Sequence, residues 1–338
     1  MGAGSVDANT GGRPPRFGSV LTAMATPFEA NGDLDVDGAV TLARWLAGHG
    51  SEGLVVAGTT GESPVLSDDE KRELWGAVAA AVTVPVVAGS GTNDTAHSVR
   101  LTKVAAEAGV AGILVVTPYY SRPPQAGLAA HFRAVAAASD LPVLIYDIPV
   151  RTGRKVAHET LVSLAWEVPT IVGVKDATGS PAESARLIAE APPDFELYSG
   201  DDALTLPLLA VGGVGVISVA SHWAGEEIAQ MVASFAKGDV DEARRINATL
   251  LESWRFQSGE LTPNPIPTKA MLRVLGLPGG ECRLPVGPAP AGLEDRARQV
   301  LDRLRRAPTG SGGSVGSVGS VGSGGSSRDG RAAGADFA

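Results

Sequence analysis

Cysteine is almost absent from this 338-residue chain, since it occurs once, at Cys282. A single cysteine excludes an intrachain disulfide and gives no sign of an oxidising compartment. The five histidines are scattered and form no cluster with the cysteine at ligand spacing, so we predict no metal site. No GxGxxG motif follows the first predicted strand, which removes the usual mark of a dinucleotide-binding sheet. We therefore expect an activity that needs no metal and no cofactor.

Long apolar runs are also missing, and none approaches the roughly 18–20 residues that a membrane-spanning helix needs. Residues 1–15 contain Gly and Pro and no apolar segment, so they match neither a signal peptide nor a membrane anchor. The net charge of -9 argues against a nucleic-acid partner and against binding to an anionic membrane surface. With 44% hydrophobic residues, the chain is expected to be a soluble, cytoplasmic protein that acts on a small molecule.

What the sequence does contain is one repeated pattern: a short apolar run, a polar or Gly-rich break, and an amphipathic stretch. Eight such runs predict strands at residues 19–25, 53–57, 85–89, 112–117, 142–146, 170–175, 195–199 and 213–219. Helical patterns lie between them, and one of these begins with a capping box formed by Ser67 and Glu70. Eight strands that each precede a helix predict an α/β fold, a closed (β/α)8 TIM barrel, rather than an open sheet.

After residue 238 the pattern changes, because three helices are predicted without a strand between them, at residues 239–257, 266–275 and 293–306. We therefore expect a leader at residues 1–16, a catalytic barrel at 17–238 and a helical extension at 239–306. Residues 307–338 are a Gly-Ser-Val repeat, which cannot bury enough apolar surface to fold and is expected to be a flexible tail.

The sixth predicted strand ends in a lysine, Lys175, after an unbroken apolar run. An ordinary lysine has a pKa near ~10.4, and burial can lower it by up to about 3–5 units, which supplies the free amine that attacks a carbonyl. Lys175 is therefore our candidate Schiff-base nucleophile. The alternative is a structural lysine that caps the strand and extends to water. The fifth strand ends in Tyr146, which is expected to lie next to Lys175 and to move protons, because neighbouring barrel strands are about 4.8 Å apart.

Three more strand ends carry polar residues, and each also has a structural interpretation. The turn at residues 58–63 offers backbone N–H donors and the hydroxyls of Thr59 and Thr60, although a plain turn has the same composition. Arg151 follows the fifth strand and could bind a carboxylate, or could instead pair with Asp147 or Asp176. Two tyrosines at residues 119–120 are also candidates, although an interface would explain them equally. The Ser-Gly-Asp-Asp sequence at residues 199–202 is the last candidate, and it could instead be a helix cap.

Together these segments resemble the dihydrodipicolinate synthase family. The similar motifs occur in the family's order and span residues 17–306: GTTGES at 58–63, TPYYSRPPQ at 117–125, YDIPVRTG at 146–153, VGVKDATG at 172–179, SGDD at 199–202, GVISV at 215–219 and PNPIPTK at 263–269. In that family a lysine forms a Schiff base with pyruvate, and the enamine adds to L-aspartate 4-semialdehyde in lysine and diaminopimelate biosynthesis. The resemblance implies the same partners here and a homotetramer built from two tight dimers.

The resemblance also implies a role for each matching residue. Lys175 resembles the nucleophile, and Tyr146 the group that moves protons at the imine. Thr59 and Tyr120 resemble its relay partners, with Tyr120 contributed by the adjoining subunit. Thr60 resembles the residue whose backbone N–H binds the pyruvate carboxylate, and Arg151 the residue that binds the semialdehyde carboxylate. Gly200 and Ile217 resemble residues of the pocket lining. The chain departs from the commonest motif at Asp147, where Asn is usual, and at Asp176, where Glu is frequent.

Two alternatives remain open from the sequence. One is a sibling pyruvate-dependent enzyme, such as N-acetylneuraminate lyase or a keto-deoxy-sugar-acid aldolase, although those tend to have Ser at the position of Thr59. The other is a barrel that binds a keto acid without turning it over. We further expect weak or absent inhibition by L-lysine, because Lys71 and His97 stand where lysine-sensitive relatives have His and Glu, and both would repel an ammonium group.

Overall fold

The computed structural model describes residues 13–306. The predicted tail at 307–338 and the first twelve residues of the predicted leader lie outside the described residues. The described chain begins at the base of the barrel, where the Arg16 backbone N–H donates to Glu196 Oε1 at 2.7 Å.

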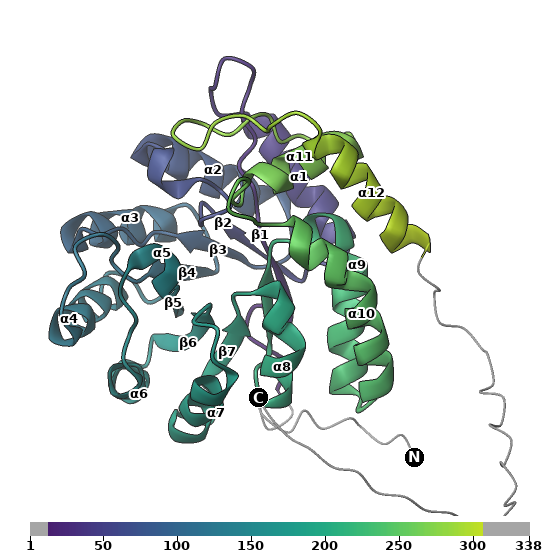
Figure 1. Cartoon of the computed structure of the whole chain (residues 1–338). Coiled ribbons are helices and arrows are strands. Elements are labelled where there is room, and N and C mark those ends of the chain that lie inside the picture. The colour runs from purple at the N-terminus through teal and green to yellow at the C-terminus, as the bar shows by residue number, and fades with distance from the viewer. Residues whose placement is uncertain (1–12, 307–338) are drawn as a thin grey trace, which may run out of the picture. The chain divides into compact units, whose positions relative to one another are not determined.

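Eight short parallel strands form a closed barrel in sequence order (Figure 1), which confirms the predicted (β/α)8 fold. Their residues are Val, Leu, Ile, Ala and Gly for the most part, because each strand is covered on both faces, by the barrel interior and by the helices. The strands are β1 Val20–Ala23, β2 Gly53–Val56, β3 Val86–Gly89, β4 Gly112–Val116, β5 Val143–Asp147, β6 Ile171–Asp176, β7 Glu196–Ser199 and β8 Gly215–Ser218.

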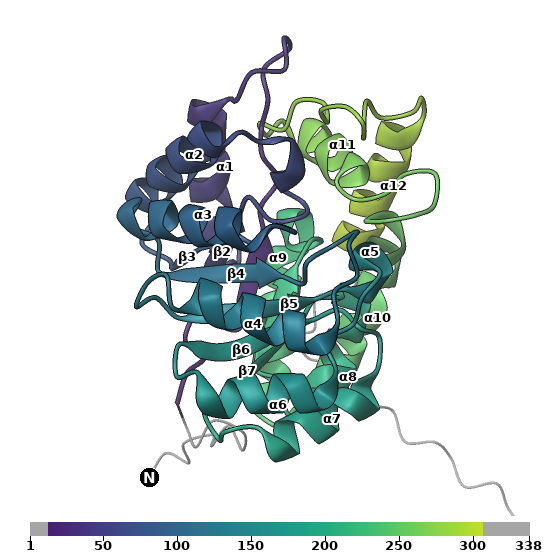
Figure 2. The ribbon, with the colours of Figure 1, turned by 90° about the vertical axis from the view of Figure 1, so that its left-hand side faces the viewer.

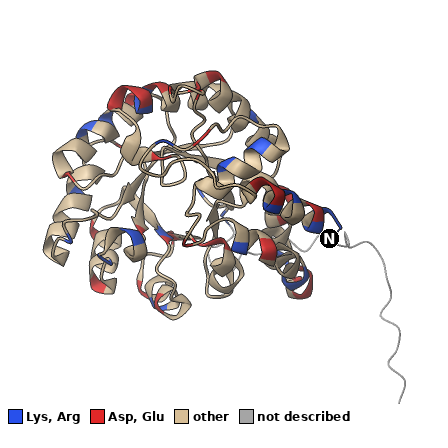
Figure 3. Ribbon diagram, turned by 45° about the horizontal axis from the view of Figure 1, so that its top comes forward, with Lys and Arg blue, Asp and Glu red and all other residues tan. Residues whose placement is uncertain are grey.

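A ring of helices surrounds the strands. It consists of α1 Val36–Gly48, α2 Asp68–Ala81, α3 Thr95–Glu107, α4 Gln125–Ala136, α6 His158–Glu167, α7 Pro181–Glu190, α8 Thr205–Ala210 and α9 Ser221–Ala236. The predicted capping box of α2 is present, since Ser67 and Glu70 each accept the backbone N–H of the other. Acidic and basic residues are interspersed along the outer helices (Figure 3). Between residues 13 and 306, no helix has the length and apolar character to cross a membrane.

Three helices follow the barrel: α10 Val240–Phe256, α11 Ile266–Leu275 and α12 Leu293–Arg306. They pack with α9 around a second apolar cluster that includes Ile228, Leu250, Met271 and Leu301. The short helix α5 Pro149–Thr152 follows β5, and Figure 2 shows α5, α11 and α12 on the same side of the strands. The helical extension therefore reaches the region where the predicted site residues lie.

Side-chain alternation decides which residues of β5 and β6 face the barrel interior. Tyr146 belongs to the interior cluster with Leu21, Tyr198 and Ile217, so the next residue, Asp147, faces the surrounding helices. Both strands begin and end one residue later than predicted, and Asp147 and Asp176 continue the ladder in register at their carboxyl ends.

Candidate active site

Lys175 and Tyr146 lie opposite each other at the ends of β6 and β5. The Lys175 Nζ atom is 4.3 Å from the centroid of the Tyr146 ring. Lys175 is 5% exposed and Tyr146 is 4% exposed, so the lysine does not extend to water as a surface lysine would. A buried amine therefore faces a buried phenol at the carboxyl end of the barrel.

Burial lowers the pKa of the Lys175 amine to about 8, because an ammonium ion loses hydration in this setting. The nearby Asp202 carboxylate raises that pKa and the Arg151 guanidinium lowers it. A lysine with a pKa of about 8 has on the order of one amine in ten unprotonated at neutral pH, compared with one in a few thousand for an ordinary lysine. Lys175 thus has the electrostatic property that a Schiff-base nucleophile needs.

Burial also raises the pKa of Tyr146 above its ordinary value, while a hydrogen bond with the Thr59 hydroxyl and the charge of Arg151 lower it. The phenol is therefore neutral at physiological pH and hydrogen-bonded to Thr59. This arrangement brings three of the predicted residues, Lys175, Tyr146 and Thr59, into one chain of contacts.

The turn after β2 carries Thr59 and Thr60 and has an unusual backbone. Ala57 and Glu62 have φ angles of 56° and 55°, a conformation that residues other than Gly seldom adopt. The Thr60 side chain is buried, and its Oγ1 accepts a hydrogen bond of 2.9 Å from Asn264 Nδ2. The turn is thus held in a defined shape, with a contact from the segment that precedes α11.

Arg151 lies on α5, and its guanidinium donates to the Asn264 carbonyl oxygen at 3.4 Å. Within residues 13–306 it forms no ion pair with Asp147 or Asp176, the structural alternative considered above. A cavity of about 660 Å³ opens here, and its lining includes Thr59, Tyr120, Tyr146 and Arg151. The cavity is large enough for a small organic substrate and has a cation at its wall.

Four predicted residues lie outside the lining of that cavity: Lys175, Thr60, Gly200 and Ile217. Ile217 is buried in the barrel interior with Tyr146. Gly200 donates its N–H to the Asp176 carbonyl at 2.7 Å, and a Cβ at this position would lie 3.1 Å from Lys175 Cγ. Gly200 therefore packs against Lys175 and Ile217 packs with Tyr146, and neither residue lines the open cavity.

Tyr120 differs from the other predicted residues because its side chain is 90% exposed. Its backbone also has a positive φ, of 71°. Val150, which also lines the cavity, is 86% exposed. The Tyr120 phenol therefore makes no buried contact with Tyr146 or Thr59 of its own chain.

Sequence reasoning missed two residues that contact this site. Asp202 is buried, and its Oδ2 atom accepts the backbone N–H groups of Val219 and Ala220, whereas the preceding Asp201 provides the helix cap expected of this sequence. Asn264 joins Thr60 to Arg151 through the two contacts given above. Both residues stand in motifs singled out by the sequence, but nothing in their spacing indicates which side chain turns inward.

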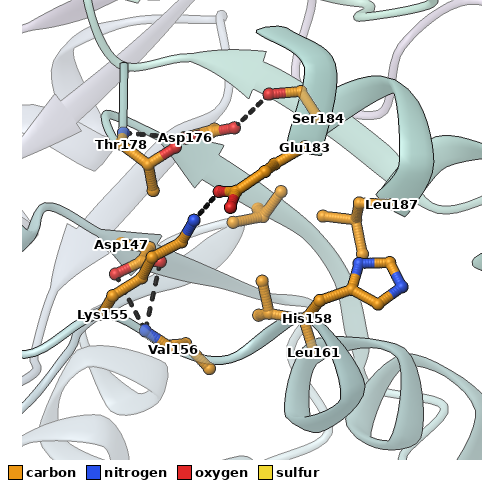
Figure 4. Close-up of a pocket in the computed structure, with 11 residues that line it drawn as sticks. Asp147, Lys155, Val156, His158, Leu161, Asp176, Thr178, Glu183, Ser184 and Leu187 are labelled. Atoms are coloured by element: carbon orange, nitrogen blue, oxygen red, sulfur yellow. Dashed lines mark hydrogen bonds and ion pairs between the residues drawn. The ribbon is translucent and has the colours of Figure 1, made fainter. Parts of the chain in front are cut away.

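A separate small cavity lies on the other side of β5 and β6, between these strands and helices α6 and α7 (Figure 4). Its volume is about 30 Å³, which is room for a water molecule. Asp147 and Asp176 face it, and Lys155 and Glu183 form an ion pair beside them. The pKa of Asp147 is raised to about 7, chiefly by burial and also by the neighbouring Asp176, although the hydrogen bond from the Val156 N–H lowers it.

In the described part of the chain, no group of three or more His, Cys, Asp or Glu side chains is arranged to hold a metal ion.

Known proteins are similar to this chain in both sequence and fold. The model of the Dihydrodipicolinate synthetase family matches residues 16–304. The 4-hydroxy-tetrahydrodipicolinate synthase of Acidothermus cellulolyticus is 52% identical over 291 residues, which are 86% of this chain and 93% of that protein.

Solved structures are similar over the same region. The crystal structure of DHDPS from Cyanidioschyzon merolae with lysine bound superposes with a TM-score of 0.83 at 45% identity, covering 86% of this chain and 99% of that one. The chloride-inhibited dihydrodipicolinate synthase from Acinetobacter baumannii, complexed with pyruvate, has a TM-score of 0.81 at 34% identity with the same two coverages. The chain described here belongs to the dihydrodipicolinate synthetase family.

Proposed function

We propose that this chain condenses pyruvate with L-aspartate 4-semialdehyde through a Schiff base at Lys175, giving 4-hydroxy-tetrahydrodipicolinate. The observation that carries the proposal is the Lys175 amine, buried, with a pKa lowered to about 8 and lying 4.3 Å from the Tyr146 ring. The family relatives named 4-hydroxy-tetrahydrodipicolinate synthase support the same reaction.

The first half of the reaction forms a nucleophilic carbon. The unprotonated Lys175 amine adds to the keto carbon of pyruvate, and the resulting alcohol leaves as water when Tyr146 supplies a proton. Loss of a proton from the pyruvate methyl group then converts the imine to an enamine. Tyr146 suits this proton transfer because its neutral phenol is hydrogen-bonded to Thr59, which can pass the proton on.

The second half joins the two substrates and releases the enzyme. The enamine carbon attacks the aldehyde carbon of the semialdehyde, forming the carbon–carbon bond and leaving a hydroxyl group. The amino group of that substrate then attacks the imine carbon, which closes the ring and frees Lys175. One water is lost over the whole condensation, so the atoms balance without an oxidant, a reductant or a cofactor.

Two elements are proposed to hold the substrate carboxylates. Backbone N–H groups of the turn at Thr59 and Thr60 bind the carboxylate of pyruvate, next to Lys175. Arg151 also lines the cavity and binds the carboxylate of the semialdehyde. Gly200 and Ile217 shape the space around the imine.

Borohydride trapping tests the proposal. With pyruvate present, reduction should add the mass of the reduced adduct to the peptide that contains Lys175, and Lys175→Ala should abolish it. The trapping rate should rise with pH with a midpoint of about 8, because only the unprotonated amine reacts. An adduct that persists in Lys175→Ala, or no adduct in the wild type, would refute the assignment.

We also propose that the chain works as a homotetramer of two tight dimers, in which Tyr120 reaches the proton relay of the adjoining subunit. Its 90% exposure in the protomer, beside the cavity lined by Tyr146, supports this role. Sedimentation velocity should give a tetramer, and Tyr120→Phe should lower kcat without changing the sedimentation coefficient. A fully active monomer would exclude the role of Tyr120.

A further inference from the structure

Glu62 closes the turn that carries Thr59 and Thr60. Its backbone N–H donates to the Thr59 carbonyl at 3.1 Å, and its φ of 55° lies in the left-handed region that a glutamate seldom adopts. Its side chain is nevertheless buried, and Glu62 as a whole is 3% exposed. An unusual backbone conformation and a buried carboxylate at one residue require specific partners.

Those partners come from the helical extension, more than 200 positions later in the sequence. The Glu62 Oε1 atom lies 2.6 Å from Nζ of Lys269 on α11, and both side chains are almost fully buried. The other oxygen, Oε2, accepts the backbone N–H of Arg283 at 2.9 Å. Lys269 also donates to the Glu281 carbonyl at 3.0 Å and lies 4.1 Å from the Phe28 ring centroid. The carboxylate is therefore held at both oxygens by the C-terminal region.

A second contact ties the same turn to the same region. Asn264 Nδ2 donates to Thr60 Oγ1 at 2.9 Å, while Asn264 Oδ1 accepts a hydrogen bond of 3.0 Å from Thr268. Thr268 and Lys269 are consecutive residues of α11. One turn of one helix thus fixes two positions of the catalytic turn, directly at Glu62 and through Asn264 at Thr60.

We infer that Glu62 and Lys269 are positioning residues for the reaction proposed above: their buried ion pair, together with Asn264, fixes the turn that places Thr59 against Tyr146. The inference rests on that proposed function. If Lys269 loses its charge, the Glu62 carboxylate is buried without a counterion, and the turn must open to hydrate it or the carboxylate must take up a proton. Either change displaces Thr59, and misplacement on the order of 1 Å can lower the rate by about a hundredfold.

Two variants separate positioning from simple stabilisation. Lys269→Met keeps the length of the side chain and removes the cation. The double variant Glu62→Gln with Lys269→Met removes both charges, so it should recover much of the thermal stability that Lys269→Met loses. The matched control is Glu294→Gln, which breaks the 2.7 Å pair between α12 and Arg273 without touching the turn.

At a temperature where all variants are folded, we expect kcat/KM for pyruvate to fall at least tenfold in Lys269→Met and to stay low in the double variant. The control should remain within twofold of the wild type. If the role is only structural, kcat/KM will recover together with the melting temperature in the double variant, and this result would overturn the inference. If Lys269→Met does not fold, the value of kcat/KM in the double variant alone tests the inference.

Hydrogen exchange gives a readout that does not depend on catalysis. Backbone amides of residues 58–63 should exchange faster in both Lys269 variants than in the wild type and the control. Unchanged exchange in that peptide would overturn the inference even if the condensation is confirmed. Conversely, a wild type that fails to condense the two substrates refutes the proposed function, and the exchange of this peptide then decides whether the pair holds the turn.

Discussion

Replacing the buried acid Asp147 with Asn should stabilise the protein at neutral and alkaline pH. Asp147 is 1% exposed, and both of its oxygens accept from the Val156 N–H, at 3.2 and 3.3 Å. Asp176 lies opposite it in the sheet and adds a second acid to the same cavity (Figure 4). Burial is the main reason that its pKa rises from 3.8 to about 7.

The sign of the effect follows from linkage. A carboxyl group whose folded-state pKa exceeds its unfolded-state value binds a proton more tightly in the folded protein. Its contribution to stability is fully present below pH 3.8 and is lost as the pH rises through 7. A shift of about 3 units corresponds to at most ~4 kcal/mol at pH 8, since each unit is worth about 1.36 kcal/mol.

The Asp147→Asn variant removes the free-energy cost of ionising a buried carboxyl group, because an amide stays neutral at every pH and its oxygen can still accept from Val156. We expect the two proteins to have similar unfolding free energies near pH 4. The variant should then gain about 1.4 kcal/mol per pH unit and level off above pH 7, at roughly 2–4 kcal/mol.

Urea denaturation of both proteins between pH 4 and 8.5 measures the difference, with reversibility checked by dilution. Taking the difference in unfolding free energy at each pH cancels the contributions of other titrating groups, such as His131 and His222, whose pKa values burial lowers to about 4. A difference that stays constant from pH 4 to 8.5 would show that Asp147 keeps an ordinary pKa and would refute the reasoning.

Three further outcomes follow from the same structure and sequence. Gly200→Ala should lower kcat at least tenfold and the melting temperature by a few degrees, because the new Cβ would lie 2.9 Å from Ala177 Cβ and 3.1 Å from Lys175 Cγ. An unchanged kcat would show that the strand end can shift to accommodate the methyl group. Deleting residues 307–338 should change neither turnover nor the melting temperature, and a loss of several degrees would reveal a docked tail. L-lysine should not reach half-inhibition below 1 mM, because Lys71 and His97 stand where an acidic wall would be needed to hold its ammonium groups. Turnover measured against rising L-lysine tests this, and half-inhibition at sub-millimolar lysine would contradict it.

The fold could be predicted from sequence because its determinants are local and repeated. Each strand is a short run of apolar residues between polar breaks, and the run itself encodes burial on both faces. The start of α2 is encoded equally locally, by Ser67 and Glu70 three residues apart. The last residues of β5 and β6 were missed because Asp147 and Asp176 are charged, and only their pairing across the ladder keeps them in the sheet.

The proximity of Lys175 and Tyr146 could also be predicted, since barrel topology makes consecutive strand ends neighbours. The contacts of Glu62 and Asn264 could not, because they depend on how the helical extension returns to the barrel, and no periodicity in the sequence encodes that path. The inward contacts of Asp202 could not be predicted either, because its partners follow another strand, β8. Its sequence context, Ser-Gly-Asp-Asp before a short helix, predicts a cap, and Asp201 provides it, whereas Asp202 turns inward to accept the N–H groups of Val219 and Ala220.

This difference has a physical basis in the range over which each determinant acts. A strand end is set by the residues beside it, so one residue of sequence suffices to place Lys175 at the carboxyl face. The electrostatic state of Lys175 is set instead by burial and by groups from two loops: its pKa depends first on burial, then on Asp202 after β7 and on Arg151 after β5. The sequence therefore identifies the nucleophile, while the free amine it needs is a property of the assembled barrel, and substitutions in either of those loops should change the pH dependence of imine formation before they change the fold.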